Sequence, residues 1–213
     1  VHVPATSANC CVGFDCLGMA VDWWAHFTFE ESDELIVEGC PDEFKGSNNL
    51  VVQAFYTTCD YLHLEYPTFK LTIDTDIPFA RGLGSSSTCV VAGILACDAW
   101  FKKNMDKMEI LKIATSIEGH PDNVAPAIFG QATACFMEKE DVKMSLVNCA
   151  DYYCMAIVPG YEVKTSQARK VLPTGMAFKD CVSQVSHALV FVQALQQGDE
   201  SLPASSCKDL LHE

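Results

Sequence analysis

The chain has 213 residues, of which 49% are hydrophobic, and this is enough apolar sequence for a sizeable core in one domain or in one and a half. Its 14 basic and 28 acidic residues give a formal net charge of -14, which disfavours binding to a nucleic acid or to an anionic membrane surface. Twelve cysteines are scattered without any C-x-x-C pair, which indicates mostly buried free thiols rather than a disulfide framework or a zinc site. No apolar run approaches the ~20 residues that span a bilayer, so we expect a cytoplasmic protein.

The first third of the chain is predicted to mix strands with one helix. Residues 21–29 alternate between apolar and mostly polar side chains, and an acidic stretch separates them from a short apolar run at residues 35–37, so an antiparallel hairpin is expected. Residues 50–62 have helical spacing, with Asn48 or Asn49 at the position of an N-cap. Residues 69–73 alternate again and predict a strand that runs into a glycine-containing loop.

The rest of the chain is predicted to group helices and strands in blocks. Residues 85–103 predict a buried helix, and the capping box from Asp106 to Glu109 opens another. The other expected helices begin near Asp122 and cover residues 166–171 and 179–197; the expected strands are 132–137, 142–147 and 152–158. Blocks of this kind favour an α+β fold over a doubly wound one. We place a domain boundary near residue 150.

The loop between the strand at 69–73 and the long helix predicts an anion-binding site. Its backbone N–H groups can converge on a phosphate at the helix N-terminus, and serine hydroxyls can contact phosphate oxygens or a magnesium ion. It is neither a Walker A loop nor a dinucleotide fingerprint, and its serines could instead only cap the helix. The residues of this loop are Pro78, Phe79, Ala80, Arg81, Gly82, Leu83, Gly84, Ser85, Ser86, Ser87 and Thr88.

This loop resembles the phosphate loop of the kinase superfamily named for galactokinase, homoserine kinase, mevalonate kinase and phosphomevalonate kinase. Two further segments narrow the resemblance to homoserine kinases. The first is Pro4-Ala5-Thr6-Ser7-Ala8-Asn9 followed by Gly13-Phe14-Asp15-Cys16-Leu17-Gly18, and the second is Glu118-Gly119-His120-Pro121-Asp122-Asn123-Val124-Ala125-Pro126-Ala127. The resemblance covers essentially the whole chain. It implies an ATP-binding domain of the two-layer, ribosomal-protein-S5-domain-2-like type at residues 1–150, and a truncated ferredoxin-like α+β domain at residues 151–213.

The same resemblance implies ATP-dependent phosphorylation of the L-homoserine hydroxyl, with Mg2+, in threonine biosynthesis. An amino-acid substrate needs an acid for its ammonium, an arginine for its carboxylate and polar groups beside its hydroxyl. By motif position, the implied substrate-binding residues are Asn9, Asp15, Thr165 and Arg169. The residues implied beside the attacking hydroxyl are His120, Asp122 and Asn123. The implied metal ligands are Ser86 and Glu118, with Glu109 as a competitor for the carboxylate, and the adenine is expected near residues 48–52.

Ordinary structural roles remain open for these residues. Asn9 and Asp15 are typical of turns, Asp122 could only cap a helix, and a lone histidine such as His120 is often structural. An arginine early in a helix, such as Arg169, is most often solvated, and so is a helical glutamate.

The sequence also departs from the family pattern. Cys10 and Cys11 stand where relatives carry leucine and glycine, and Gln131 stands where a second glycine is common. The family's closing basic segment and glycine-rich motif are missing after Glu213, which predicts an exposed edge and an apolar patch on the sheet of the second domain. Two other functions therefore stay open, namely a kinase of another small alcohol and a catalytically incomplete nucleotide-binding fragment. A homodimer is compatible with the resemblance.

Overall fold

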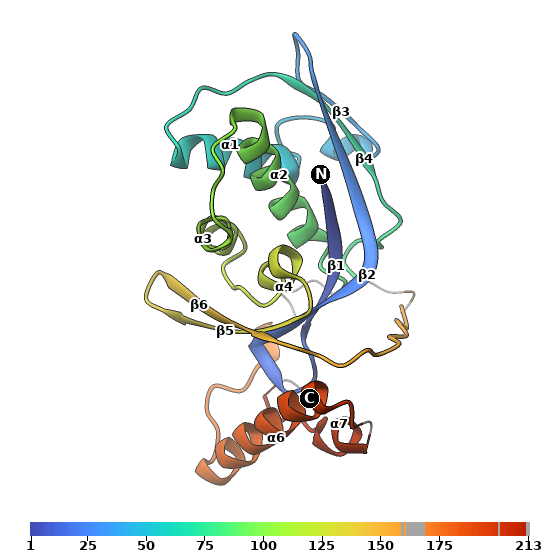
Figure 1. Ribbon diagram of the computed structural model, residues 1–213, viewed down its shortest axis with the longest axis vertical. Helices are drawn as coiled ribbons and strands as arrows, with labels where there is room; N and C mark the ends of the chain where they lie inside the picture. The colour runs from blue at the N-terminus through green and yellow to red at the C-terminus, as the bar shows by residue number, and fades with distance from the viewer. Residues whose placement is uncertain (159, 161–168, 200, 212–213) are drawn as a thin grey trace.

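The computed structural model describes residues 1–158, 160, 169–199 and 201–211, which form one mixed sheet with helices packed against it (Figure 1). The strand order is β3-β4-β2-β5-β6, and β1 pairs with β2. The strands are β1 (His2–Asn9), β2 (Gly13–Glu31), β3 (Ile36–Glu38), β4 (Phe69–Asp74), β5 (Ala132–Glu138) and β6 (Asp141–Val147). The α-helices are α1 (Leu50–Tyr61), α2 (Ser85–Phe101), α3 (Lys107–Glu118), α4 (Val124–Phe129), α6 (Phe178–Gln197) and α7 (Ser201–Ser206). The 3-10 turns are η1 (Asp42–Phe44) and η2 (Arg169–Val171). The α+β class expected from the sequence is confirmed.

Helices α1 to α4 cover one face of the sheet and enclose the main core with it (Figure 1). Helix α2 is apolar around most of its circumference because it lies in the middle of this layer, with α1 and α3 beside it. The glycine at 93 allows α1 to approach closely, since a Cβ there would lie 2.3 Å from the carbonyl oxygen of Val51. The other face of β2 and β4 is open, whereas α6 and α7 lie beyond β5 and β6 (Figure 1).

Capping side chains fix the helix starts that the sequence predicted. Asn49 accepts a hydrogen bond from the backbone N–H of Val51 (2.9 Å), and Asp106 accepts one from that of Glu109 (2.8 Å). Both satisfy donors that a helix leaves unpaired in its first turn. The predicted helices 50–62, 85–103 and 179–197 and the strands at 69–73, 132–137 and 142–147 are therefore confirmed within a few residues.

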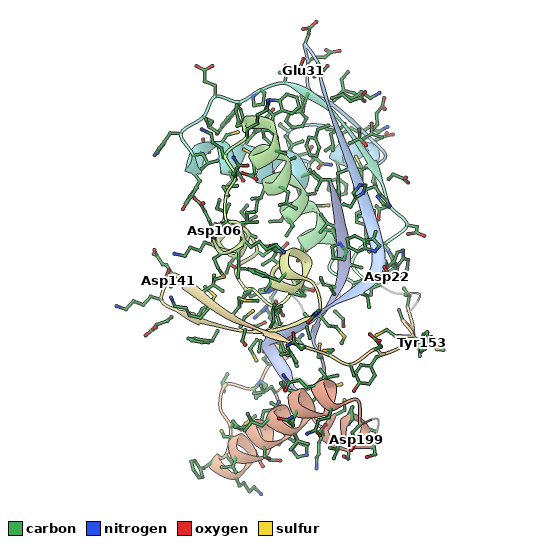
Figure 2. All side chains as sticks on the ribbon, in the orientation of Figure 1. Asp22, Glu31, Asp106, Asp141, Tyr153 and Asp199 are labelled. Atoms are coloured by element: carbon green, nitrogen blue, oxygen red, sulfur yellow. The ribbon has the colours of Figure 1, made fainter. Side chains whose placement is uncertain are left out.

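Several predicted elements were wrong. β3 does not form an antiparallel hairpin with β2 but pairs in parallel with β4, because β4 occupies the edge of β2 from His26 to Glu31. Residues 152–158 are not a strand, and most of their side chains are exposed; Figure 2 shows Tyr153 pointing away from the helices. Of the predicted helix 166–171, residues 169–171 form only a 3-10 turn, and the earlier part lies outside the described residues. The strand β1 and the helix α7 were not predicted.

The cysteines are free, as expected, but they are not mostly buried. Only Cys59, Cys97 and Cys135 are fully buried, and four others are exposed. No helix among the described residues is both long and apolar enough to cross a membrane.

A second, smaller core joins α6 to the turn between β1 and β2. Val12 and Leu17 pack there with Phe191 and Leu195. The buried Gln184 ties the layers together, since its Nε2 donates to the carbonyl of Val12 (2.8 Å) and to Asp209 (2.7 Å). The domain boundary at residue 150 stays a prediction.

The outer side of α6 carries an apolar stripe. Phe178, Val182, Val185 and Leu189 follow the period of one helix face and are exposed within the described chain. An exposed apolar patch was expected in this region from the sequence, although on a sheet rather than on a helix.

The turn between β1 and β2 stores backbone strain, which gives a first testable prediction. Asn9, Cys10 and Cys11 all have positive φ angles (65°, 40° and 67°), and Cys11 is exposed. Because glycine adopts this conformation without steric cost, we expect Cys11→Gly to raise the free energy of unfolding by about 0.5–1 kcal/mol in a urea titration. Cys16→Gly is the matched control: it lies in β2 without a positive φ, so it should destabilise. A lower free energy of unfolding in Cys11→Gly would show that this turn is not strained at Cys11.

Candidate functional site

The loop between β4 and α2 has the backbone shape of an anion cradle. Ala80, Gly82 and Gly84 have φ angles of 54°, 73° and 64°, so left-handed residues recur at every second position before α2 begins at Ser85. Left-handed residues interspersed in a loop turn its N–H groups toward one concave side, and the N-terminus of α2 adds its dipole there. The backbone N–H of Thr6 donates to the carbonyl of Leu83 (3.2 Å) and fixes the loop against β1.

The end of this loop packs against two polar side chains from distant parts of the sequence. Thr6, which is fully buried, donates from Oγ1 to Oδ1 of Asn123 (2.8 Å). Only a glycine fits at 84, since a Cβ there would lie 2.0 Å from Thr6 Oγ1 and 3.2 Å from Asn123 Oδ1. The hydrogen bond also fixes the Asn123 amide, so its NH2 group is left to donate to another partner.

Asp15 and Arg169 form a two-armed ion pair although they are 154 positions apart. Arg169 Nη1 and Nη2 donate to the two carboxylate oxygens of Asp15 at 2.9 and 2.5 Å. Its guanidinium also lies 5.3 Å from the ring centre of Phe14. Asp15 itself has a positive φ of 58°, and its N–H donates to Oδ1 of Asn9 (2.9 Å). The pair is only about one-third exposed, so a carboxylate and a guanidinium are held together at the rim of the site.

His120 and Asp122 lie next to this ion pair. Nδ1 of His120 is 2.6 Å from Oδ1 of Asp122, whose side chain is almost fully buried. Ligand atoms of Asp15, His120 and Asp122 all lie within 4.8 Å of one another. The hydrogen bond to Asp122 raises the pKa of His120, against the effect of its burial. The site therefore places two carboxylates, one guanidinium and one imidazole in one small volume.

The carboxylate of Glu118 ends α3 close to the serines of the loop. Its burial raises its pKa, while the hydroxyl of Ser86 and the charge of His120 act against that rise. Ser87 Oγ is buried near this carboxylate but makes no hydrogen bond of regular geometry within the described chain. Glu109, the competing carboxylate, lies in the first turn of α3, roughly 13 Å away along the axis. Glu118, Ser86 and Ser87 thus form an oxygen-rich donor set of the kind that Mg2+ prefers.

A cavity of about 190 Å³ opens beside the loop. Most of its wall is apolar, with Phe27, Ile73 and Ile77 from the sheet side, and Ser85, Ser86 and Thr88 from the start of α2. Asn49 and Leu50, from the segment where the adenine is expected, also line it. The cavity can hold a flat, weakly polar group next to an anion on the loop.

The protonation of His120 gives a second testable prediction. Its pKa in the folded chain is raised above the ordinary value of 6.5, so its stabilising effect is present in full below pH 6.5 and is lost as the pH rises through the folded pKa. We expect His120→Gln to lower the free energy of unfolding most at pH 6 and least at high pH. Urea titrations across this range measure the difference, and His63→Gln, at an exposed position, is the control. If the loss of unfolding free energy in His120→Gln is the same at every pH, the ion pair between His120 and Asp122 would be contradicted.

Most of the residues that the sequence singled out lie together, but not all can be described. Asn9, Asp15 and Arg169 meet, and His120, Asp122, Asn123 and Glu118 lie beside them. Asp122 is not the cap of α4, because Asn123 takes that position. Thr165 lies outside the described residues. Sequence reasoning missed Thr6 and Phe14, although both belong to motifs that it quoted.

Three comparisons relate this chain to known proteins. Residues 49–131 match the family model described as the GHMP kinases N terminal domain. The homoserine kinase of Clostridium botulinum (strain ATCC 19397 / Type A) is 41% identical over 216 residues, which cover 100% of this chain and 72% of the relative. The homoserine kinase of Clostridium novyi (strain NT) is 37% identical over 100% of this chain and 73% of its own length.

Solved structures agree with these matches. The crystal structure of a homoserine kinase from Cytophaga hutchinsonii has a TM-score of 0.84 and 28% identity, over 100% of this chain and 71% of that one. A phosphomevalonate kinase from Streptococcus pneumoniae has a TM-score of 0.71 at 13% identity, over 97% of this chain and 77% of that one, and shares the fold alone.

Proposed function

Because the chain belongs to the homoserine kinase family, we propose that it transfers the γ-phosphoryl group of ATP to the side-chain hydroxyl of L-homoserine and forms O-phospho-L-homoserine. The ion pair between Asp15 and Arg169 is the observation that carries this proposal. The chain is thus a phosphotransferase with an alcohol group as acceptor.

The ion pair has the charges that a zwitterionic amino acid requires. In the bound state, the substrate ammonium takes the place of the guanidinium at Asp15, and the substrate carboxylate takes the place of Asp15 at Arg169. Each charge of the protein then keeps a partner, so the exchange leaves no uncompensated charge in the site. Asn9 holds the backbone of Asp15, and Phe14 supports the guanidinium from its face.

The donor nucleotide fits the loop and the cavity beside it. The phosphates of ATP lie in the cradle from Pro78 to Thr88, at the N-terminus of α2, and the adenine enters the cavity lined by Asn49 and Leu50. The mostly apolar wall suits a purine ring, whereas the serines at the cavity's edge suit the ribose and the phosphates. This arrangement points the γ-phosphate toward Asn123 and the acceptor.

The residues near the loop fit a magnesium ion. Glu118 and Ser86 would hold it, and the buried hydroxyl of Ser87, which lacks a regular partner in the described chain, adds a third oxygen. When bound, the ion neutralises negative charge on the β- and γ-phosphates. The carboxylate of Glu118 would bind the ion from the side of the loop serines, with His120 as its neighbour on the acceptor side.

The remaining residues position the acceptor hydroxyl rather than act as a strong base. Phosphoryl transfer depends mainly on alignment and on charge stabilisation, so a dedicated base is not needed. The NH2 group of Asn123, fixed by Thr6, donates to an oxygen at the reacting centre, and protonation of His120, which its hydrogen bond to Asp122 favours, offsets the negative charge that gathers there. Asp122 orients His120 through its buried carboxylate.

The setting of the reaction follows from the same family. We place the product in threonine biosynthesis and the protein in the cytoplasm, and a homodimer remains compatible with the family. A kinase of another small alcohol with this fold is disfavoured. A purely anionic acceptor would draw Arg169 away from Asp15 and leave that carboxylate without a partner, and a neutral acceptor would make no use of either charge.

Coupled release of ADP tests the proposal. The chain is incubated with magnesium-ATP, with and without L-homoserine, and ATP binding is followed in parallel. Turnover that depends on L-homoserine supports the proposal. Retained ATP binding without turnover on any acceptor would instead mark these 213 residues as a nucleotide-binding fragment, and turnover only on an acceptor without an ammonium group would assign another alcohol.

A further inference from the structure

A row of three polar side chains crosses the open face of the sheet at the point where β4 ends. His2 of β1 stands directly opposite His26 of β2, and His26 stands directly opposite Asp74 of β4. All three are exposed. Figure 2 shows Asp22 on the side of β2 that faces away from the helices, and His26 shares that side because side chains alternate along a strand.

The two histidines are close enough to share one ligand. Their Nδ1 atoms are 2.5 Å apart, and their ring centres are 4.7 Å apart with planes at 75°. At this distance one Nδ1 must donate and the other accept, because two N–H groups facing each other would clash. The two nitrogens can therefore share one cation between them, either a proton or a metal ion.

We propose that His2 and His26 form a binding site for a divalent transition-metal ion that clamps β1 to β2, with the charge of Asp74 beside His26 favouring the cation. Imidazole nitrogens suit Zn2+, Ni2+ and Cu2+ among the divalent ions, water completes the coordination of an exposed ion, and a carboxylate nearby adds negative charge. Metal–nitrogen distances of about 2.0–2.1 Å with a tetrahedral angle put the two nitrogens about 3.3 Å apart. Both rings are exposed, so a small rotation of each can widen the Nδ1–Nδ1 distance from 2.5 Å to this separation.

The position of the row means that a bound ion would also affect strand β1. Directly opposite side chains on adjacent strands have Cβ atoms about 4.5–5.5 Å apart, so Asp74 lies beside His26, on the side away from His2, and adds its negative charge near an ion held by the histidines. β1 carries Thr6 and Asn9 toward its other end; the backbone N–H of Thr6 holds the phosphate loop at Leu83, and Asn9 holds the backbone of Asp15. An ion in this row therefore anchors the strand that supports both halves of the active site. The row is separate from Asp15, His120 and Asp122, which line the acceptor site.

Nickel binding tests the site. The exposed thiols are first alkylated, because free cysteines also bind soft metals. We expect titration calorimetry of the whole chain with NiCl2 to give one equivalent of binding and a rise in the thermal midpoint. His2→Gln and His26→Gln should each weaken binding by at least about tenfold, and Asp74→Asn should weaken it by less. All three positions are at the surface, so circular dichroism should remain that of the parent chain.

Two controls separate this site from other metal ligands. His63→Gln removes another exposed histidine and should leave nickel binding unchanged. The double variant Asp15→Asn/His120→Gln disables the other cluster of possible ligands and should also leave it unchanged. Nickel binding that survives in both His2→Gln and His26→Gln, or that disappears in the double variant, would overturn the proposal. The same holds if no binding is seen at millimolar nickel.

Discussion

Replacing either member of the Asp15–Arg169 pair by alanine is expected to lower kcat/KM for L-homoserine by roughly 10²-fold. Each change removes a charge-assisted hydrogen bond to one end of the substrate and leaves the opposite substrate charge desolvated without a partner. The pair is about one-third exposed, so its loss should cost the fold no more than about 1 kcal/mol. Coupled ADP release measures the activity, and a urea titration of the same samples checks that the variants are folded.

Acceptor analogues show which charge each residue binds. 4-Hydroxybutanoate lacks the ammonium of homoserine, and 3-aminopropan-1-ol lacks its carboxylate. Asp15→Ala should therefore lose the preference for L-homoserine over 4-hydroxybutanoate, and Arg169→Ala should lose the preference over 3-aminopropan-1-ol. Lys170→Ala removes an exposed neighbouring cation and should change neither ratio. An Asp15→Ala enzyme that still rejects 4-hydroxybutanoate would show that the ammonium binds elsewhere.

The fold was predictable wherever the deciding interaction is local in sequence. Asn49 and Asp106 cap helices through backbone groups two or three positions away, so the cap and the following apolar spacing suffice to place α1 and α3. The partner of β3 could not be found in this way. Its parallel pairing with β4 depends on which edge of β2 is free, and that is settled by contacts across more than 30 residues.

Strand β1 was missed for a related reason. It has no alternation of apolar and polar residues, because Val3, Pro4, Ala5 and Thr6 are all buried. Residues 152–158 show the reverse case: they form a continuous apolar run that predicts a strand, but no strand in the described part of the chain pairs with them. The pattern of apolar residues indicates what a segment could bury, whereas strand pairing depends on a partner elsewhere in the chain.

The candidate site was predicted through family motifs rather than through local chemistry. Asp15 and Arg169 are 154 positions apart, and neither has a neighbour in sequence that indicates the other. Thr6 had no assigned role, since a buried threonine in an apolar strand looks like an ordinary core residue until Asn123 is placed beside it. Distances of this kind need the three-dimensional structure.

The contact between Thr6, Asn123 and the phosphate loop leads to the second large expected effect. Gly84→Ala places a Cβ where Thr6 Oγ1 now lies, so either the Thr6–Asn123 hydrogen bond breaks or the end of the loop moves. A displacement near 1 Å at a reacting centre costs about 10²-fold in rate, and we expect kcat to fall by that factor. Overpacking should also lower the free energy of unfolding by about 1–3 kcal/mol. Steady-state kinetics and urea titration measure the two effects.

Gly119→Ala is the control that separates the clash from backbone strain. Gly119 also has a left-handed φ (87°), but a Cβ there would meet no atom within 4 Å. Gly119→Ala should lower the free energy of unfolding by about 1 kcal/mol through backbone strain, and Gly84→Ala includes the same contribution. Because Gly119→Ala adds no clash, it should leave kcat nearly unchanged. Removing the obstructing hydroxyl in Thr6→Ala/Gly84→Ala should make the double variant less damaged than the sum of its single changes. Additive losses would mean that Gly84 acts on the loop without Thr6, and equal kcat values for the two glycine variants would remove the clash as the cause.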